Sequence, residues 1–447
     1  MAAAIAPGAR PISSVDELIG AFAAGEKPRA AWRIGVEHEK IGVVAATGMP
    51  LAFDGAGGIE ALLAHLAAGG SWHEVREGTR VIALARGAEN VTLEPGGQLE
   101  HSAAPTATLA ESEAALEQHL GELVAPSREA GAAWLGVGFR PFGTRDDVAW
   151  MPKGRYAIMR DYLPTRGRLA HEMMQRTATV QANLNFADEA DAAAKLAAAS
   201  GVSSIVTALY ACSPIVDGKD SGYQSYRAGV WLETDPDRCG LLPLAFEEGD
   251  LYRRYAEWAL DVPMFFLYRD GYRAAGGMTF RRFLREGFGD ERATMADWTM
   301  HVSTLFPEVR LKQVIELRGA DAGPMPMVLA LPALWKGLLY DDDACREARR
   351  LTAGWSFAER LALRESVPRA GLAARAGGRS VLELARELVA IARAGLTRLA
   401  PDDVAALAPL EEIAQSGRAP AERVREVFRD ARGPAESVQA LRLVGTD

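Results

Sequence analysis

The sequence predicts an α+β fold built around an antiparallel sheet with one polar face. Segments that alternate like strands are interleaved with segments of helical periodicity along most of the chain. Several expected strands alternate apolar residues with acids and amides, so each has one face for a core and one polar face. Such strands are commoner in antiparallel sheets than in doubly wound parallel sheets, whose strands are apolar on both faces.

The expected elements follow from local patterns. A helix is expected over residues 13–24, where Ser14 and Glu17 fit a capping box. Two strands are expected over 90–101, joined by a Pro-Gly-Gly turn. Alternating or apolar runs predict further strands at 33–44, 80–84, 133–139, 177–186, 262–268 and 310–318. Periodic apolar residues predict helices at 58–68, 107–129, 188–211 and from about 328 onward, with loops at 213–240 and 372–379 and a loop with a helical turn at 153–163.

The composition limits the class of protein. The chain has 447 residues, 49% of them hydrophobic, and 59 acids against 50 bases give a net charge of −9. We expect no nucleic acid partner, although a local site can still bind small anions. Three widely spaced cysteines indicate neither a disulfide framework nor a zinc site. The first residues lack a secretory signal pattern, and apolar stretches such as Met325–Leu334 are too short to span a bilayer. We therefore expect a cytoplasmic protein with no membrane partner.

Two glutamates lie on the polar face of the expected strand at 33–44. Glu37 and Glu39 point away from Ile34 and Val36, because successive side chains of a strand alternate. Taken alone, a Glu-x-Glu strand is most often a solvent-facing strand. The metal-binding interpretation therefore depends on whether other acids lie beside this one.

The other expected strands add acids and amides to polar faces. Glu94 and Glu100 lie on the two arms of the hairpin, and Glu316 shares a face with Arg318. Alone, the hairpin would be a surface turn and the Glu-x-Arg pair a surface ion pair. The strand at 177–186 presents three amides on one face: Gln181, Asn183 and Asn185.

The five glutamates suggest a metal site if their faces converge. Carboxylates packed together repel one another, so they cannot all remain ionised without a partner. Divalent cations resolve that conflict, and carboxylate oxygens suit Mg²⁺, which also bridges to substrate phosphates. The sequence contains no GxxxxGK phosphate loop. Any nucleotide would therefore be bound by metals and basic side chains.

Seven blocks of the sequence resemble the plant-type glutamate–cysteine ligases, and they occur in the order of that family. They cover the chain from about residue 14 to about residue 430. The blocks are IGVEHEKIGV (34–43), TLEPGGQLEHSAAP (92–105), MPKGRYAIMRDYLP (151–164), RTATVQANLNF (176–186), RAGVWLETDPDRCGLLP (227–243), DVPMFFLYR (261–269) and FPEVRLKQVIELRGAD (306–321).

The resemblance implies a glutamine-synthetase-like catalytic fold, in which an antiparallel sheet forms a funnel for metal ions and is flanked by helices. It also implies a single catalytic domain over 1–447. The sheet-containing core would cover 1–345, and a mainly helical C-terminal part at 346–447 would pack on it. The implied protein is a monomer or a homodimer.

The resemblance also implies roles for particular residues. The metal-binding set is Glu37, Glu39, Glu94, Glu100, Glu316 and Gln181, with Asn183 as the alternative to Gln181. Arg318 and Glu316 would be catalytic, with Arg318 at the phosphate being transferred. Arg155 and Arg227 would bind glutamate, and Trp231 and Tyr268 are candidates for the cysteine pocket, although core packing explains those two rings equally well. Lys40 and Lys153 would contact nucleotide phosphate.

The implied activity is the first step of glutathione synthesis. L-glutamate and L-cysteine would be joined at the expense of ATP, a co-substrate, with two or three Mg²⁺ ions as cofactors. Three alternatives remain open. A ligase of the same chemistry with another amine acceptor, as in ergothioneine synthesis, would have the same metal site. A glycoside hydrolase needs paired carboxylates but fewer acids and no ATP. A non-catalytic relative would bind ligands only.

Overall fold

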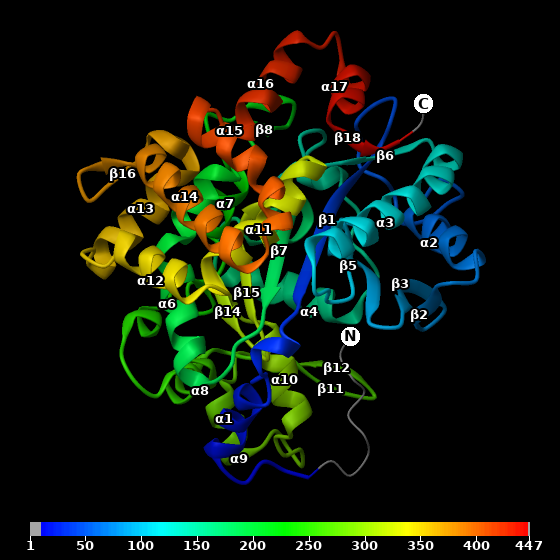
Figure 1. The fold of residues 1–447 in the computed structure, drawn as a ribbon. Helices are drawn as coiled ribbons and strands as arrows, with labels where there is room; N and C mark the ends of the chain where they lie inside the picture. Colours follow the sequence, from blue (N-terminus) through cyan, green and yellow to red (C-terminus); the bar gives the residue numbers. More distant parts are fainter. Residues whose placement is uncertain (1–9, 446–447) are drawn as a thin grey trace.

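Ten strands form one antiparallel sheet through the centre of the protein (Figure 1). The computed structural model describes residues 10–445. Every paired strand of this sheet runs antiparallel to its neighbour, which confirms the predicted α+β class. The order of eight strands is β14 (Val309–Leu311), β15 (Ile315–Asp321), β7 (Thr179–Leu184), β1 (Ile34–Val44), β5 (Leu99–Ser102), β4 (Glu89–Leu93), β3 (Arg80–Arg86) and β2 (His73–Glu77).

The long strand β1 organises this sheet. One half of β1 pairs with β7 and β5, and the other half pairs with β6 (Ala132–Leu135). The C-terminal strand β18 (Arg442–Val444) pairs with β6. Residues 346–445 are mainly helical, and β18 joins the end of this part to the sheet.

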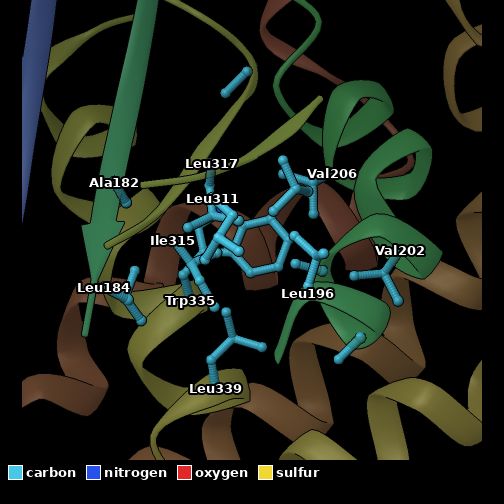
Figure 2. Packing of buried hydrophobic residues seen from close by; sticks show 14 of the residues in the cluster. Ala182, Leu184, Leu196, Val202, Val206, Leu311, Ile315, Leu317, Trp335 and Leu339 are labelled. Carbon is cyan, nitrogen blue, oxygen red and sulfur yellow. The ribbon is translucent and has the colours of Figure 1, made fainter. Parts of the chain in front are cut away.

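Helices α6 (Glu189–Leu209) and α11 (Met325–Leu339) pack on the apolar face of β7 and β15. Figure 2 shows Leu196 of α6 on the side of the helix that faces strand residues such as Ile315, and Val202 and Val206 of α6 belong to the same cluster. Trp335 and Leu339 of α11 lie in the same cluster, together with Ala182, Leu184, Leu311 and Leu317 of the strands. Because this face is filled by a core, the opposite face of the same strands is left for polar groups.

The N-terminal half contains helices whose ends follow familiar capping rules. In α3 (Leu109–Ala130), Thr108 and Glu111 form a capping box, and Gly131 ends the helix with a left-handed φ of 62°. The capping box predicted at Ser14 is wrong, because Ser14 makes no capping hydrogen bond and the backbone N–H of Ser13 donates to Glu17 instead. The other helices of this half are α1 (Val15–Ala23), α2 (Ile59–Ala68), α4 (Gly154–Tyr162) and α5 (Ala170–Arg176).

The remaining helices cover the second half of the chain, and those after α11 form the C-terminal layer seen in Figure 1. They are α7 (Tyr226–Trp231), α8 (Leu251–Asp261), α9 (Phe280–Glu286), α10 (Met295–Ser303), α12 (Asp342–Leu351), α13 (Phe357–Ala370), α14 (Val381–Leu399), α15 (Ala408–Ser416), α16 (Pro420–Asp430) and α17 (Pro434–Leu441). Small hairpins are made by β8 (Ile215–Val216) with β9 (Lys219–Asp220), β11 (Phe266–Arg269) with β12 (Gly271–Ala274), and β16 (Arg375–Ala376) with β17 (Arg379–Ser380). The short strands β10 (Cys239–Gly240) and β13 (Phe306–Pro307) pair in parallel.

Four sequence expectations are corrected by these elements. Residues 153–163 form a regular helix, α4, rather than a loop with a helical turn. The expected strand at 310–318 is a hairpin of β14 and β15. The expected loop at 213–240 contains α7. Helix α6 corrects the expectation that the apolar stretches are too short to span a bilayer, because by length and composition it could cross one; 83% of its most apolar window is buried inside the fold.

Candidate active site

The register of the sheet brings the predicted acids and amides together on one face. Glu37 on β1 lies opposite Gln181 on β7, and Glu39 lies opposite Glu100 on β5. On the other side of β7, Asn183 lies opposite Glu316 on β15. Directly opposed residues in an antiparallel pair point to the same face. We call the side chains of Glu37, Glu39, Glu94 and Glu100 the acid face.

The carboxyl groups of the acid face are crowded. Burial and the nearby Glu316 and Glu100 carboxylates raise the pKa of Glu37 to about 7. Burial, together with the negative charge of Glu94 and Glu100, raises the pKa of Glu39 well above its usual value. The pKa of Glu100 is raised in the same way. These shifts are the expected result of like charges held close together in a partly enclosed site.

Neutral donors, not cations, hold the carboxylates of the acid face. The amide of Asn183 donates to Glu37 Oε1 at 2.7 Å, and the backbone N–H of Thr179 donates to Glu39 Oε2 at 3.0 Å. None of the four glutamates forms an ion pair with any residue in 10–445. Lys312, Arg227 and Lys153 act on Glu37, Glu39 and Glu100 only from a distance. Negative charge on this face is therefore not balanced by a directly paired cation.

The acid face fits a divalent cation by its chemistry. Four carboxyl groups without a cationic partner supply the hard oxygen ligands that Mg²⁺ prefers. In the described part of the chain, however, no three His, Cys, Asp or Glu side chains are already arranged around one cation position. The observation that supports a metal is therefore the unbalanced charge, and not a preformed ligand shell.

Glu316 differs from the four acids because cations already surround it. Arg310 Nη2 contacts Glu316 Oε1 at 2.6 Å and Lys312 Nζ contacts Oε2 at 2.5 Å, while Arg318 Nη1 also pairs with Oε1. These cations hold the pKa of Glu316 well below its usual range against the effect of burial. Its side chain is fully buried, with 0% exposed. This geometry disfavours Glu316 as a metal ligand and favours a role in holding Arg318.

Arg318 lies between the acid face and Glu316. Its Nη1 donates to Gln181 Oε1 at 2.6 Å, and the Nε2 of Gln181 donates to Glu37 at 3.2 Å. The predicted metal ligand Gln181 therefore uses its carbonyl oxygen to orient an arginine. Asn183, the alternative, has an Oδ1 that is buried and has no hydrogen-bond partner in the described residues, so it is the better placed amide.

The two candidate lysines lie in different surroundings. Lys153 precedes α4 and donates from Nζ to Leu93 O at 2.8 Å; Glu94 and Glu100 are close enough to influence its charge. Lys40 lies on the other face of β1, completely buried, and donates to His38 O at 3.0 Å. This position disfavours the predicted contact of Lys40 with nucleotide phosphate.

A polar pocket lies next to Arg318 and contains two of the four predicted substrate residues, Arg227 and Trp231. Its walls include Arg227 and Trp231 of α7, Arg318 of β15 and Arg364 of α13. The Nε of Arg227 and the Nε1 of Trp231 are buried without a hydrogen-bond partner among residues 10–445. Donors left without an acceptor beside a pocket are available to a bound carboxylate.

The remaining substrate candidates lie outside this pocket. Arg155 on α4 donates from Nη2 to the hydroxyl of Tyr156 at 3.2 Å, and Glu94 is among the charges that act on it. Tyr268 packs against Tyr272 in the β11–β12 hairpin, with ring centroids 4.9 Å apart. That contact supports the packing interpretation of Tyr268 rather than a place in the cysteine pocket.

The fold and the acid face define a class of protein, one in which an antiparallel sheet carries a cluster of carboxyl groups on its polar face. The fold is similar to that of a glutamate–cysteine ligase from Francisella tularensis in complex with AMP, with a TM-score of 0.54 and 12% identity over 92% of this chain and 91% of that chain. Residues 33–440 match the model of glutamate–cysteine ligase family 2. The chain belongs to this family.

Curated relatives agree with this assignment. The chain is 43% identical to a chloroplastic glutamate–cysteine ligase of Brassica juncea, over 92% of this chain and 80% of the relative. It is 41% identical to glutamate–cysteine ligase A of Oryza sativa subsp. indica, over 92% of this chain and 83% of the relative. The predicted activity, ATP-dependent ligation of glutamate to cysteine as the first step of glutathione synthesis, is confirmed by family membership.

The predicted cytoplasmic location is contradicted by the same relatives. Those from Brassica juncea, Arabidopsis thaliana and Solanum lycopersicum are all named chloroplastic. The prediction depended partly on three cysteines, which are unpaired in the structure. Free cysteines are compatible with any reducing compartment and cannot distinguish between two of them.

The raised pKa of Glu37 predicts an unusual pH dependence of stability for metal-free protein. The pKa rises from 4.5 to about 7 on folding, so the folded state binds the proton more tightly. This contribution to the free energy of unfolding is fully present below pH 4.5 and is lost as the pH rises through about 7. In EDTA, we expect the melting temperature to fall between pH 5.5 and pH 8, by roughly 1 °C for each kcal/mol lost in a chain of 447 residues.

Differential scanning fluorimetry across this pH range tests the prediction. Glu37→Gln is the matched variant, because it cannot ionise and should flatten the pH dependence. An equal slope in the wild type and in Glu37→Gln would contradict it.

Proposed function

We propose that the acid face is the metal site of this ligase and holds two or three Mg²⁺ ions through Glu37, Glu39, Glu94 and Glu100. Four carboxyl groups that face one site without an ion pair carry this proposal. Bound Mg²⁺ supplies positive charge that offsets the repulsion between ATP and the glutamate carboxylate. We also propose that the sheet forms a glutamine-synthetase-like funnel.

The chain's own side chains would then position the reacting groups. Arg318, held by Glu316 and Gln181, points its guanidinium toward the acid face and would stabilise charge on the phosphoryl group being transferred. Lys153 lies beside the acid face, where its ammonium can meet a nucleotide phosphate. Arg227 and Arg155 would hold the carboxylates of glutamate, which places Trp231 beside the incoming amine.

Two displacements complete the proposed reaction. An oxygen of the glutamate γ-carboxylate attacks the γ-phosphorus of ATP, the bond to ADP breaks, and γ-glutamyl phosphate forms. The nitrogen of cysteine then attacks the acyl carbon, phosphate leaves, and the nitrogen loses a proton as the amide forms. The carboxylate is activated in the first step because it is a poor electrophile by itself.

A coupled assay of ADP release tests the reaction and the acceptor together. We expect ADP release that requires glutamate, cysteine and Mg²⁺, and that falls to background when any one of them is omitted. Replacing cysteine with other small amino acids tests the alternative of a ligase with another amine acceptor. If kcat/KM is higher with one of these amines than with cysteine, that amine is the acceptor and cysteine is not.

A further inference from the structure

Asp321 is a buried carboxylate at the end of β15, three residues beyond Arg318. Both of its oxygens accept hydrogen bonds. The backbone N–H of Cys212 donates to Oδ2 at 2.9 Å, and the hydroxyl of Ser213 donates to the same oxygen at 2.6 Å. The hydroxyl of Ser225 donates to Oδ1 at 2.8 Å. Asp321 is 1% exposed. It therefore cannot contact a substrate directly, and its influence must pass through its neighbours.

The two serines connect Asp321 to the first turn of α7. The backbone N–H of Arg227 donates to Ser213 Oγ at 3.1 Å, and the backbone N–H of Ala228 donates to Ser225 Oγ at 3.0 Å. Each serine oxygen accepts from the helix, so its own proton is free to donate to Asp321. The carboxylate thus fixes the start of α7, the helix that carries Arg227 and Trp231.

A β-bulge brings Asp321 to the polar side of the sheet. Leu317 lies opposite Ala182 and Ala320 lies opposite Val180, so β15 has one more residue than β7 over this interval. The extra residue shifts the alternation, and Asp321 lies opposite Thr179 on the same face as Gln181. Without the bulge, alternation would turn Asp321 toward the apolar core.

Arg227 connects this bulge to α7. Its Nη2 donates to the carbonyl oxygen of Arg318 at 3.0 Å, and its Nη1 lies 3.9 Å from Asp321 Oδ1. Its Nε remains without a partner beside the pocket. One guanidinium therefore contacts both the backbone of the bulge and the carboxylate that anchors α7.

We propose that Asp321 is a positioning residue for the glutamate site, which fixes Arg227 against the bulge that presents Arg318. This inference depends on the proposed assignment of Arg227 to glutamate. The network requires an acceptor at both oxygens of residue 321. An asparagine has the same shape, but in either orientation its NH₂ group would face N–H or O–H donors.

Asp321→Asn in the full-length protein is the central test. We measure glutamate binding by isothermal titration calorimetry with Mg²⁺ and a non-hydrolysable ATP analogue, and binding of that analogue alone. We expect glutamate affinity to fall at least about tenfold, or roughly 1.4 kcal/mol, because hydrogen bonds to a charged carboxylate that hold Arg227 are lost. Affinity for the analogue should change by less than about threefold, or roughly 0.7 kcal/mol. Ser225→Ala, a milder change in the same network, should weaken glutamate binding in the same direction.

Asp403→Asn is the matched control. Asp403 is also buried and accepts from Lys336 Nζ at 2.6 Å, but both residues lie in the helical layer formed by α11 and the C-terminal helices. We expect this control to lose thermal stability and to keep its glutamate affinity.

Two results would overturn the proposal: a folded Asp321→Asn protein with wild-type glutamate affinity, or equal weakening of glutamate and the ATP analogue. If Asp321→Asn does not fold, Ser225→Ala decides by the same criteria. Failure of the wild type to bind glutamate would instead refute the proposed function.

Discussion

Replacing Arg318 with alanine is expected to lower kcat by more than about a hundredfold, since one well-placed donor to a developing charge contributes roughly 3–4 kcal/mol. The fold should tolerate the change, because Arg310 and Lys312 still balance the buried charge of Glu316. Steady-state ADP release and the melting temperature, measured on the same preparation, test both parts of the prediction.

Two further variants separate charge from geometry at this position. Arg318→Lys keeps the charge but loses the planar guanidinium, whose Nη1 contacts both Gln181 and Glu316, so most of the activity should remain lost. Arg282→Ala removes an exposed arginine whose one ion-pair partner among residues 10–445 is Glu286 of the same helix, and it should be fully active. Turnover of Arg318→Ala within about tenfold of the wild type, a barrier change of only 1.4 kcal/mol, would exclude the proposed role.

The sequence predicts the polar face well where the strands are regular. In β1 and β5, simple alternation predicts that Glu37, Glu39 and Glu100 are on one side, and the register confirms it. The same alternation puts Lys40 on the opposite side from Glu39, so its burial was already predictable from its position. The interpretation of Lys40 as a phosphate ligand relied on the resemblance alone.

The sequence does not predict contacts that depend on irregular backbone. Arg310 and Lys312 surround Glu316 because β14 and β15 form a tight hairpin, whereas a single strand was expected there. The position of Asp321 depends on a bulge, which shifts the alternation by one residue. Helix α7 has only six residues, too few for helical periodicity to be visible.

The buried environment of Glu316 also changes what its variants should do. Because three cations contact this carboxylate, Glu316→Gln would leave uncompensated positive charge in the interior. Breaking a buried pair costs about 3–5 kcal/mol. Loss of activity in this variant would therefore combine lower stability with a displaced Arg318, and it would not identify a metal ligand.

Replacing Glu39 with glutamine is expected to abolish activity and, at the same time, to stabilise the metal-free protein. Glu39 and Glu100 are directly opposed across β1 and β5, and like charges in this position destabilise a sheet. Glutamine removes one of the repelling charges at nearly constant shape. We expect kcat to fall by more than about a hundredfold, a barrier change of at least 2.7 kcal/mol, while the melting temperature in EDTA rises at pH 8.

The metal makes this prediction specific. In the wild type, added Mg²⁺ should raise the melting temperature, because a ligand that binds only the folded state stabilises it. In Glu39→Gln that increase should be much smaller.

The control is Glu89→Gln: Glu89 already pairs with Arg86 and His101, which hold its pKa at about 2 despite burial. Its variant should be less stable and should keep the full response to Mg²⁺. If Glu39→Gln were destabilised in EDTA and still responded fully to Mg²⁺, the acid face would not be the metal site, and the unbalanced charge on β1 and β5 would need another explanation.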